Sequence, residues 1–153
     1  MSQHQAAIQW HRIPHLLDDN TYSRNHIATL NGQQSVNVSS SVEYKGDPEC
    51  SDPEQMLVGA LASCHMLTFL AIAEFHGYRV EKYEDVAVGY LEKVEGVGMA
   101  VTRIDLAPKV VFGGSKLPDA AAISRIHDRA HKNCFIGNSI KAKVSVVANA
   151  IPA

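Results

Sequence analysis

The sequence predicts an α+β fold from two patterns: short segments of alternating apolar and polar residues, and two longer segments with helical periodicity. The expected order is three strands, a helix, two strands, a second helix and a final strand. With 153 residues, 46% of them hydrophobic, the chain can form one domain with a core and is short for two. Because it has no internal repeat or low-complexity linker, we expect a single domain over residues 1–153.

The strands are predicted from period-two alternation between turn signals. They are expected at residues 6–12, 25–30, 35–44, 86–94, 99–112 and 143–150. The dipeptide Asn31-Gly32 predicts a hairpin between the second and third of them, because both residue types tolerate the positive φ of a tight turn. A glycine-containing turn at residues 95–98 similarly joins the fourth and fifth strands.

The longest predicted element is a helix over residues 53–76. Asp52 fits its N-cap, Pro53 its first position, and Gln55 can complete a capping box with Asp52. Gly77 then provides the stop. Such a helix would be about 36 Å long at 1.5 Å per residue, so it must cross the centre of the molecule or enter a partner subunit.

Residues 56–73 of this helix are nearly uncharged and long enough to just cross a bilayer. Glutamates flank the segment instead of Lys or Arg, polar residues interrupt it, and the sequence has no second one. We therefore expect a helix that is buried on every side in a soluble protein, with no membrane partner.

The cellular location and the partners are predicted from the first residues, the cysteines and the charges of the chain. The first residues lack the basic start and apolar stretch of a secretory signal, and three widely spread cysteines do not form a disulfide scaffold. These features predict a cytoplasmic protein. The net charge of -2, with scattered Lys and Arg, argues against binding nucleic acid.

A second helix is expected to begin near Pro118. Ile123, Ile126 and Ala130 have the spacing of one helical face, which should pack against the first helix. Four residues further along this face lies Cys134, so the face could carry its thiol toward Cys64 in the first helix. A reversible disulfide is feasible if the two Cα atoms come within about 7 Å. The alternative is that both cysteines are small core residues.

Two segments resemble the cysteine motifs of the OsmC/Ohr family. One is Asp-Pro-Glu-Gln at 52–55, followed ten residues after its glutamate by Cys64; the other is Ala-His-Lys-Asn-Cys at 130–134. The order of elements also agrees with the family from about residue 7 to residue 148. The resemblance implies an OsmC-like fold and an intertwined homodimer, with long helices at its centre and active sites at the subunit interface.

The resemblance further implies a thiol peroxidase that reduces organic hydroperoxides to alcohols. Cys64 would be the peroxidatic cysteine and form a sulfenic acid, and Cys134 would resolve it to a disulfide. An external dithiol reductant would reopen that bond, and no cofactor is implied. In the family, an arginine held by the motif's glutamate assists the thiol. Glu54 matches this glutamate, and we expect Arg24 to be the arginine, with Arg12 as the alternative.

Elementary chemistry explains why a cation would be needed. A thiol of pKa near 8.5 is about 3% ionised at pH 7, so complete ionisation raises the reactive population only about thirty-fold. Burial in an apolar helix disfavours the thiolate further. A cation would hold the thiolate and stabilise the departing oxygen.

Other signals leave alternatives open. His127 and His131 lie at i and i+4 on one helical face, but the sequence fixes no third ligand, so we expect no metal and keep metal binding as an alternative. His65 points about 100° away from Cys64, which argues against a Cys-His pair. Phe135 replaces the proline that many family members carry. Cys50 is expected to be a bystander, and a non-catalytic binding dimer of the same fold is the alternative function.

Overall fold

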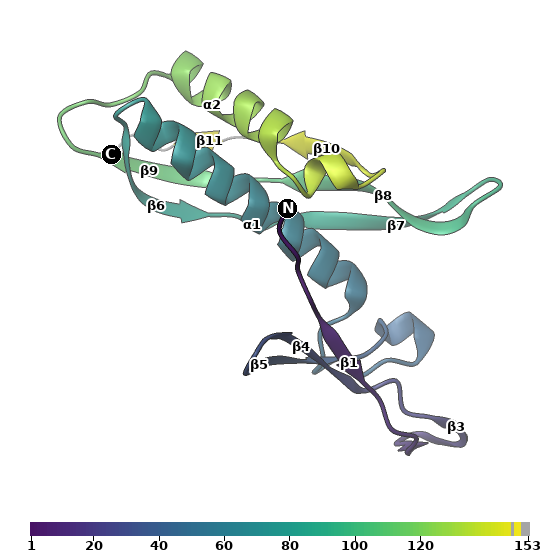
Figure 1. Cartoon of the computed structure of the whole chain (residues 1–153). Helices are drawn as coiled ribbons and strands as arrows, with labels where there is room; N and C mark the ends of the chain where they lie inside the picture. The colour runs from purple at the N-terminus through teal and green to yellow at the C-terminus, as the bar shows by residue number, and fades with distance from the viewer. Residues whose placement is uncertain (148, 151–153) are drawn as a thin grey trace. The chain divides into compact units, whose positions relative to one another are not determined.

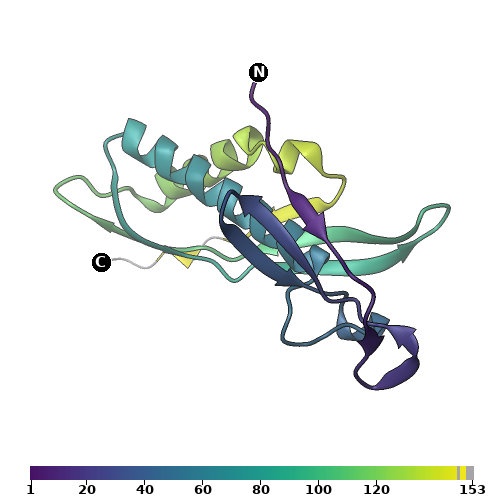
Figure 2. The same ribbon diagram turned by 60° about the horizontal axis from the view of Figure 1, so that its bottom comes forward.

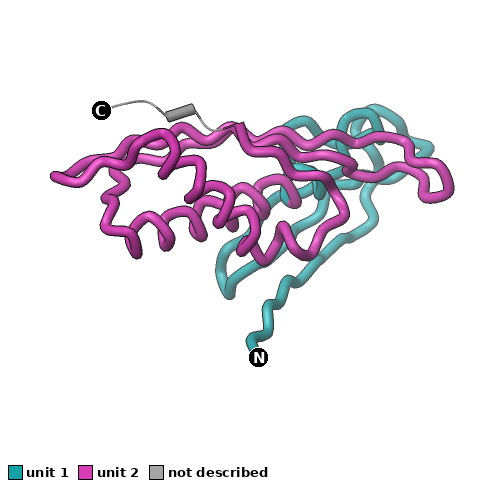
Figure 3. Tube along the Cα trace, turned by 90° about the horizontal axis from the view of Figure 1, so that it is seen from above, with its two compact units in different colours: residues 1–56 teal, residues 57–153 magenta. Residues whose placement is uncertain are grey.

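The computed structural model describes residues 1–147 and 149–150. The chain divides into two compact units, residues 1–56 and residues 57–153 (Figure 3). The first contains the N-terminal strands and the start of the first helix. The second contains the rest of that helix, the second helix and the remaining strands. The single domain expected over residues 1–153 stays a prediction.

The described residues confirm the α+β class, with short strands before, between and after two α-helices (Figure 1). The strands of the first unit are β1 (Ala7–Gln9), β2 (Pro14–His15), β3 (Asp18–Tyr22), β4 (His26–Asn31) and β5 (Gln34–Val38). Those of the second are β6 (Arg79–Glu84), β7 (Val88–Val94), β8 (Gly98–Leu106), β9 (Lys109–Gly113), β10 (Lys143–Val146) and β11 (Asn149–Ala150). The helices are α1 (Pro53–Phe75) and α2 (Ala120–Asn133), with 3₁₀ turns η1 (Val42–Tyr44) and η2 (Gly137–Ser139).

The first unit is built on an antiparallel sheet in the order β1-β4-β5, drawn in purple and blue in Figure 2. The hairpin between β4 and β5 is confirmed, and Gly32 adopts the positive φ of 58° that its turn requires. A second hairpin, β2 with β3, was not predicted. Its residues Leu16 and Leu17 stand at the turn and are exposed, so no alternation marks this hairpin.

Only the first half of the strand expected at residues 35–44 is observed. It ends at Val38, and residues 42–44 form the turn η1. The reason lies in the serines between them. Ser39 uses its hydroxyl twice, donating to Asn25 and accepting from the Asp47 N–H, and such local bonds compete with a sheet ladder.

Helix α1 starts and stops where its caps predict. The Gln55 N–H donates to the Asp52 carboxylate at 2.7 Å, and the Asp52 N–H donates to the Gln55 side-chain oxygen at 3.1 Å, which is a complete capping box. At the other end, Gly77 has a φ of 74° and its N–H donates to the carbonyl of Glu74.

The prediction that α1 is buried on every side is wrong for the described chain. Its four fully buried residues follow one another at intervals of four and so form a single stripe: Leu61, His65, Phe69 and Ala73. Leu67 and Phe75 are 60% and 83% exposed. Among the described residues, α1 alone is long and apolar enough to span a membrane, but a core helix of a soluble protein meets the same test.

In the second unit, β6 pairs with β9 and β7 with β8, both antiparallel. The strand predicted at 99–112 is divided into β8 and β9 at Ala107 and Pro108, because proline has no N–H for the ladder and the Ala107 N–H donates to Asp85 instead. Strand β6 was missed. A register shift between Val80 and Lys82 breaks the alternation by which a strand is recognised.

The strand predicted at 143–150 is observed as two pieces. β10 pairs with β8 and β11 pairs with β9, both in parallel. Ala148, which lies between the pieces, is outside the described residues. The C-terminal strands therefore extend both antiparallel strand pairs of the second unit.

Helix α2 begins at the N-cap Asp119, whose carboxylate accepts from the Ala122 N–H. Within the second unit, both helices lie side by side on one face of the strands (Figures 1 and 2). The predicted contact between them is confirmed. The buried cluster they share with β9 consists of Phe69, Ala73, Val110, Phe112, Ile123, Ile126 and Ala130. A second cluster joins α1, β8 and the residue after α2: Leu61, Ile104, Leu106 and Cys134.

Candidate thiol active site

Cys64 and Cys134 come together in the second unit. Cys134, the residue that caps the C-terminus of α2, is 1% exposed within the cluster that contains Leu61. Cys64, in the middle of α1, is half-buried and packs against this cluster. Both are free thiols. The face that continues from Ala130 thus carries Cys134 to Cys64, as helical periodicity indicated.

The environment of Cys64 favours its thiolate. Burial raises the pKa of the Cys64 thiol, but hydrogen bonds outweigh burial and leave this pKa below its ordinary value. The main donors are, in decreasing order, the Ile136 N–H, the Cys134 thiol and the Phe135 N–H, whereas the Thr68 hydroxyl donates to the Cys64 carbonyl at 2.8 Å. Two of these three donors are backbone groups directly after Cys134, and no residue type in the sequence predicts their direction.

The environment of Cys134 disfavours its thiolate. Burial, and next its position as hydrogen-bond donor to Cys64, raise the pKa of the Cys134 thiol to about 11. The Gly137 N–H points at its sulfur from 3.3 Å but does not reverse this effect. The pair therefore consists of one thiol that loses its proton more easily than an ordinary cysteine and one that keeps its proton at neutral pH.

Arg24 and Glu54 both line one cavity in the first unit. Its volume is about 570 Å³, and Trp10, Tyr22 and Tyr44 also line it. In the described part of the chain, Arg24 and Glu54 form no ion pair with each other. The expected glutamate–arginine contact is therefore not formed, and the two side chains share only the lining of this cavity.

Neighbouring residues fix the Arg24 guanidinium. Its Nη1 donates to the Tyr22 carbonyl and, at 3.4 Å, to the Thr21 hydroxyl, while its central carbon lies 4.6 Å from the centre of the Tyr22 ring. The alternative arginine, Arg12, faces the same ring from 5.7 Å. Tyr22 therefore holds both candidates, and Arg24 is the one that lines the cavity with Glu54.

A buried histidine pair links the two helices of the second unit. His65 and His127 are 1% and 4% exposed, and His65 Nε2 lies 3.1 Å from His127 Nδ1. Burial is the main reason why the pKa of each imidazole falls to about 4, so both are neutral at pH 7. The sequence analysis did not predict this pair, which joins two residues 62 positions apart.

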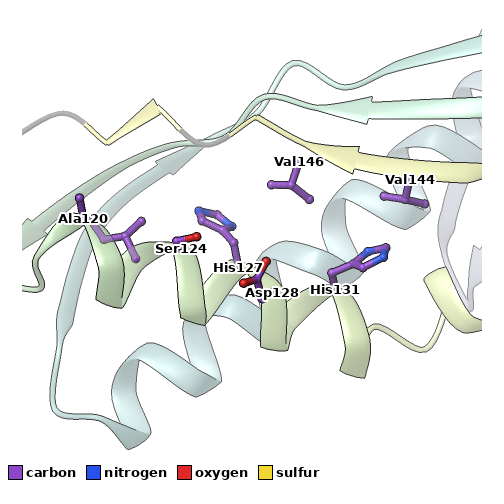
Figure 4. Close-up of a pocket in the computed structure, with 8 residues that line it drawn as sticks. Ala120, Ser124, His127, Asp128, His131, Val144 and Val146 are labelled. Atoms are coloured by element: carbon purple, nitrogen blue, oxygen red, sulfur yellow. The ribbon is translucent and has the colours of Figure 1, made fainter.

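His127 and His131 also line a cavity of about 480 Å³ between α2 and β10, where Figure 4 shows them projecting toward Val144 and Val146. No described residue hydrogen-bonds the buried Nε2 of His127. Within residues 1–147 and 149–150, no three His, Cys, Asp or Glu side chains form a group that could hold a metal ion. Metal binding by the two histidines stays an untested alternative.

Cys50 differs from both other cysteines. It lies in the first unit, and burial followed by the charges of Asp47 and Glu49 raises the pKa of its thiol. A thiol held in its protonated form is a poor nucleophile. This environment agrees with the expectation that Cys50 is a bystander.

The fold and site define a small α+β domain with two helices beside its sheets and a neighbouring pair of free cysteines. The chain belongs to the OsmC-like protein family, whose pattern matches residues 46–149. This finding confirms the resemblance carried by the two cysteine motifs. The family includes organic hydroperoxide resistance proteins.

Three relatives illustrate the match. An OsmC-like protein of unknown function from Vibrio cholerae is 40% identical, with a TM-score of 0.88 over 99% of this chain and 100% of that one. The uncharacterized protein YmaD of Bacillus subtilis is 27% identical over 126 residues, 81% of this chain and 83% of YmaD. An organic hydroperoxide resistance protein OsmC from Legionella pneumophila is 16% identical, with a TM-score of 0.69 over 98% and 97% of the two chains. The last likeness shows the fold alone.

Proposed function

We propose that this protein is a thiol-dependent peroxidase that reduces organic hydroperoxides to alcohols, with Cys64 as the peroxidatic and Cys134 as the resolving cysteine. The observation that carries the proposal is the unequal acidity of two neighbouring thiols, lowered pKa at Cys64 and raised pKa at Cys134. Attack requires a thiolate, and resolution requires a second thiol that waits in its protonated form.

The chemistry balances in three steps. The Cys64 thiolate attacks the outer peroxide oxygen, the O–O bond breaks, and the organic oxygen takes a proton and leaves as the alcohol. The Cys64 sulfenic acid then condenses with the Cys134 thiol, forming an S–S bond and releasing water. An external dithiol reduces this disulfide by exchange and becomes oxidised itself, so no bound cofactor is required.

Arg24 and Glu54 are proposed to serve the peroxide group. A guanidinium can donate hydrogen bonds to the oxygen on which negative charge develops, and a carboxylate can accept the hydroperoxide O–H. Their common place on one cavity wall supports this assignment. The contacts from Tyr22 that fix Arg24 would reduce the reorganisation needed when the charge develops.

The protein is further proposed to act as a cytoplasmic homodimer. The uncovered apolar face of α1, which includes Leu67 and Phe75, supports association with a second copy. Analytical ultracentrifugation should give twice the chain mass, and Leu67→Asp should shift it toward the monomer. A wild-type monomer at micromolar concentration would refute the dimer.

The peroxidase proposal is tested by mass spectrometry after one equivalent of organic hydroperoxide. We expect a Cys64–Cys134 disulfide in the wild type, a trappable sulfenic acid at Cys64 in Cys134→Ser, and at least a hundred-fold loss of turnover in Cys64→Ser. Cys50→Ser is the matched control and should behave as the wild type. Undiminished peroxide consumption by Cys64→Ser would refute the proposal and favour the non-catalytic binding dimer.

A further inference from the structure

We infer that the cavity beside Arg24 selects hydroperoxides whose carbon group is an aromatic ring, with Trp10 as the residue that determines this preference. The inference rests on the proposed peroxidase function and names its substrate class. The cavity measures about 570 Å³, within the range of small-molecule sites. Its wall combines three aromatic side chains with the guanidinium and the carboxylate already assigned to the peroxide group.

The aromatic wall is held in place before any ligand arrives. The Trp10 indole N–H donates to the Ser23 carbonyl at 2.9 Å, and Ser23 itself is buried. The Trp10 ring meets the Tyr22 ring edge to face, with centroids 5.6 Å apart and planes at 80°. Because the indole is anchored at its nitrogen, its position does not depend on the ligand.

Part of this aromatic surface remains available. Trp10 is 44% exposed and Tyr22 is 42% exposed, although each packs against the other. One face of Tyr22 carries the Arg24 guanidinium at 4.6 Å. A ligand ring placed against Trp10 would therefore lie beside the group that receives its hydroperoxide end.

The two ends of the cavity match the two ends of one kind of molecule. Arg24 and Glu54 suit a hydroperoxide group, which both accepts and donates hydrogen bonds. Trp10 and Tyr44 suit a flat ring, because aromatic pairs gain more than their buried area alone provides. That gain corresponds to roughly two- to ten-fold in selectivity over a saturated ring of the same shape.

The test compares cumene hydroperoxide with its saturated cyclohexyl analogue, which keeps the carbon skeleton and replaces the flat aromatic ring by a puckered saturated one. We expect the wild type to favour cumene hydroperoxide by about two- to ten-fold in kcat/KM. Trp10→Leu should remove the preference, and Trp10→Phe should retain part of it because a ring remains. Val97→Ala, which truncates a 73% exposed apolar side chain outside this cavity, is the control and should leave the ratio unchanged.

A second readout does not need turnover, because Trp10 is the only tryptophan of the chain. In Cys64→Ser, 2-phenyl-2-propanol should change the Trp10 fluorescence saturably and bind several-fold more tightly than the cyclohexyl alcohol. If the wild type reduces neither hydroperoxide while this binding persists, the peroxidase proposal fails and the aromatic site stands. Equal kcat/KM values for both hydroperoxides, or equal binding of both alcohols, would overturn the inference.

Discussion

The two compact units position their functional side chains in opposite ways. In residues 57–153, the thiols belong to a packed interior: Cys134 is 1% exposed and Cys64 packs against the cluster around it. In residues 1–56, all of which the structure describes, the buried hydrophobic side chains are just Ala28 and Val38. Arg24 is held there by local hydrogen bonds and by the Tyr22 ring instead of a core.

This difference indicates that the two units have different roles. A sulfur fixed by core packing keeps its neighbours and hence its pKa, which suits a nucleophile whose acidity must be set accurately. Side chains on a weakly packed surface can change with little loss of stability, which suits the recognition of substrates. Variants in the second unit should therefore affect stability and thiol acidity, and variants in the first should affect selectivity.

The largest effect is expected from removing the central aromatic ring of the second unit. Phe69 is fully buried, with its ring centre 4.3 Å from that of His127 and 5.6 Å from that of Tyr83. Phe69→Ala should lower the free energy of unfolding by about 3–5 kcal/mol, because it leaves a cavity that the core cannot fill. Urea denaturation measures this loss.

The matched variant in the first unit is Leu17→Ala. Leu17 is 91% exposed, so the change should cost about 0.5 kcal/mol or less. Comparable losses in the two variants would contradict the contrast between a packed and a weakly packed unit.

The next effect concerns acid stability and the His65–His127 pair. The pKa of both falls to about 4, mainly through burial; the charge of His131 contributes at His65, and at His127 the charge of His65 contributes while Asp128 acts in the opposite direction. The unfolded chain binds protons near pH 6.5, so it holds more protons than the folded chain between pH 6.5 and 4. The free energy of unfolding should therefore fall by about 2 kcal/mol per histidine, or on the order of 4 kcal/mol for the pair, between pH 6.5 and 4.5.

Urea denaturation at several pH values would measure this slope. Replacing both histidines, His65→Gln with His127→Gln, should flatten it, whereas the exposed control His131→Gln should keep most of it. In the first unit, Asp18 and Asp47 have pKa values below 3.8, held there mainly by the Lys45 and Glu49 hydrogen bonds, so their contribution is lost at lower pH. An unchanged slope in the double variant would assign the acid sensitivity to other groups.

The sequence predicted those features that depend on interactions between residues close together in the chain. The ends of α1 follow from Asp52, Gln55 and Gly77, whose interactions span a few positions and hardly depend on the rest of the fold. The bulge in β6 depends on a partner strand distant in sequence, and β5 ends before η1 because the Ser39 hydroxyl bonds Asn25 and the Asp47 N–H, so alternation failed in both places. The exposed faces of α1 escaped prediction because composition does not say what covers an apolar helix.

The candidate site likewise has features that could be predicted from the sequence and features that could not. The approach of Cys134 to Cys64 could be predicted, because helical periodicity places both on facing surfaces. The amide donors at Phe135 and Ile136 could not, since every non-proline residue carries an N–H and no residue type marks its direction. The aromatic wall at Trp10 was also missed, because its partner Tyr22 lies on a hairpin that showed no alternation.

The smallest effect isolates one backbone donor of the second unit. The Phe135 N–H helps to lower the pKa of Cys64, and proline at this position has no N–H to donate. Cys134 has φ -72° and ψ 115°, a conformation that a following proline accepts, so Phe135→Pro should fold. We expect the pKa of Cys64 to rise by about one, the effect of one hydrogen bond to a charged group. The pH dependence of iodoacetamide alkylation in a Cys50→Ser background measures this pKa.

Phe135→Ala is the control, because it keeps the N–H and loses only a side chain that is 81% exposed. It should leave the pKa of Cys64 unchanged. Equal rises in both variants would assign the effect to the phenyl ring and exclude the amide.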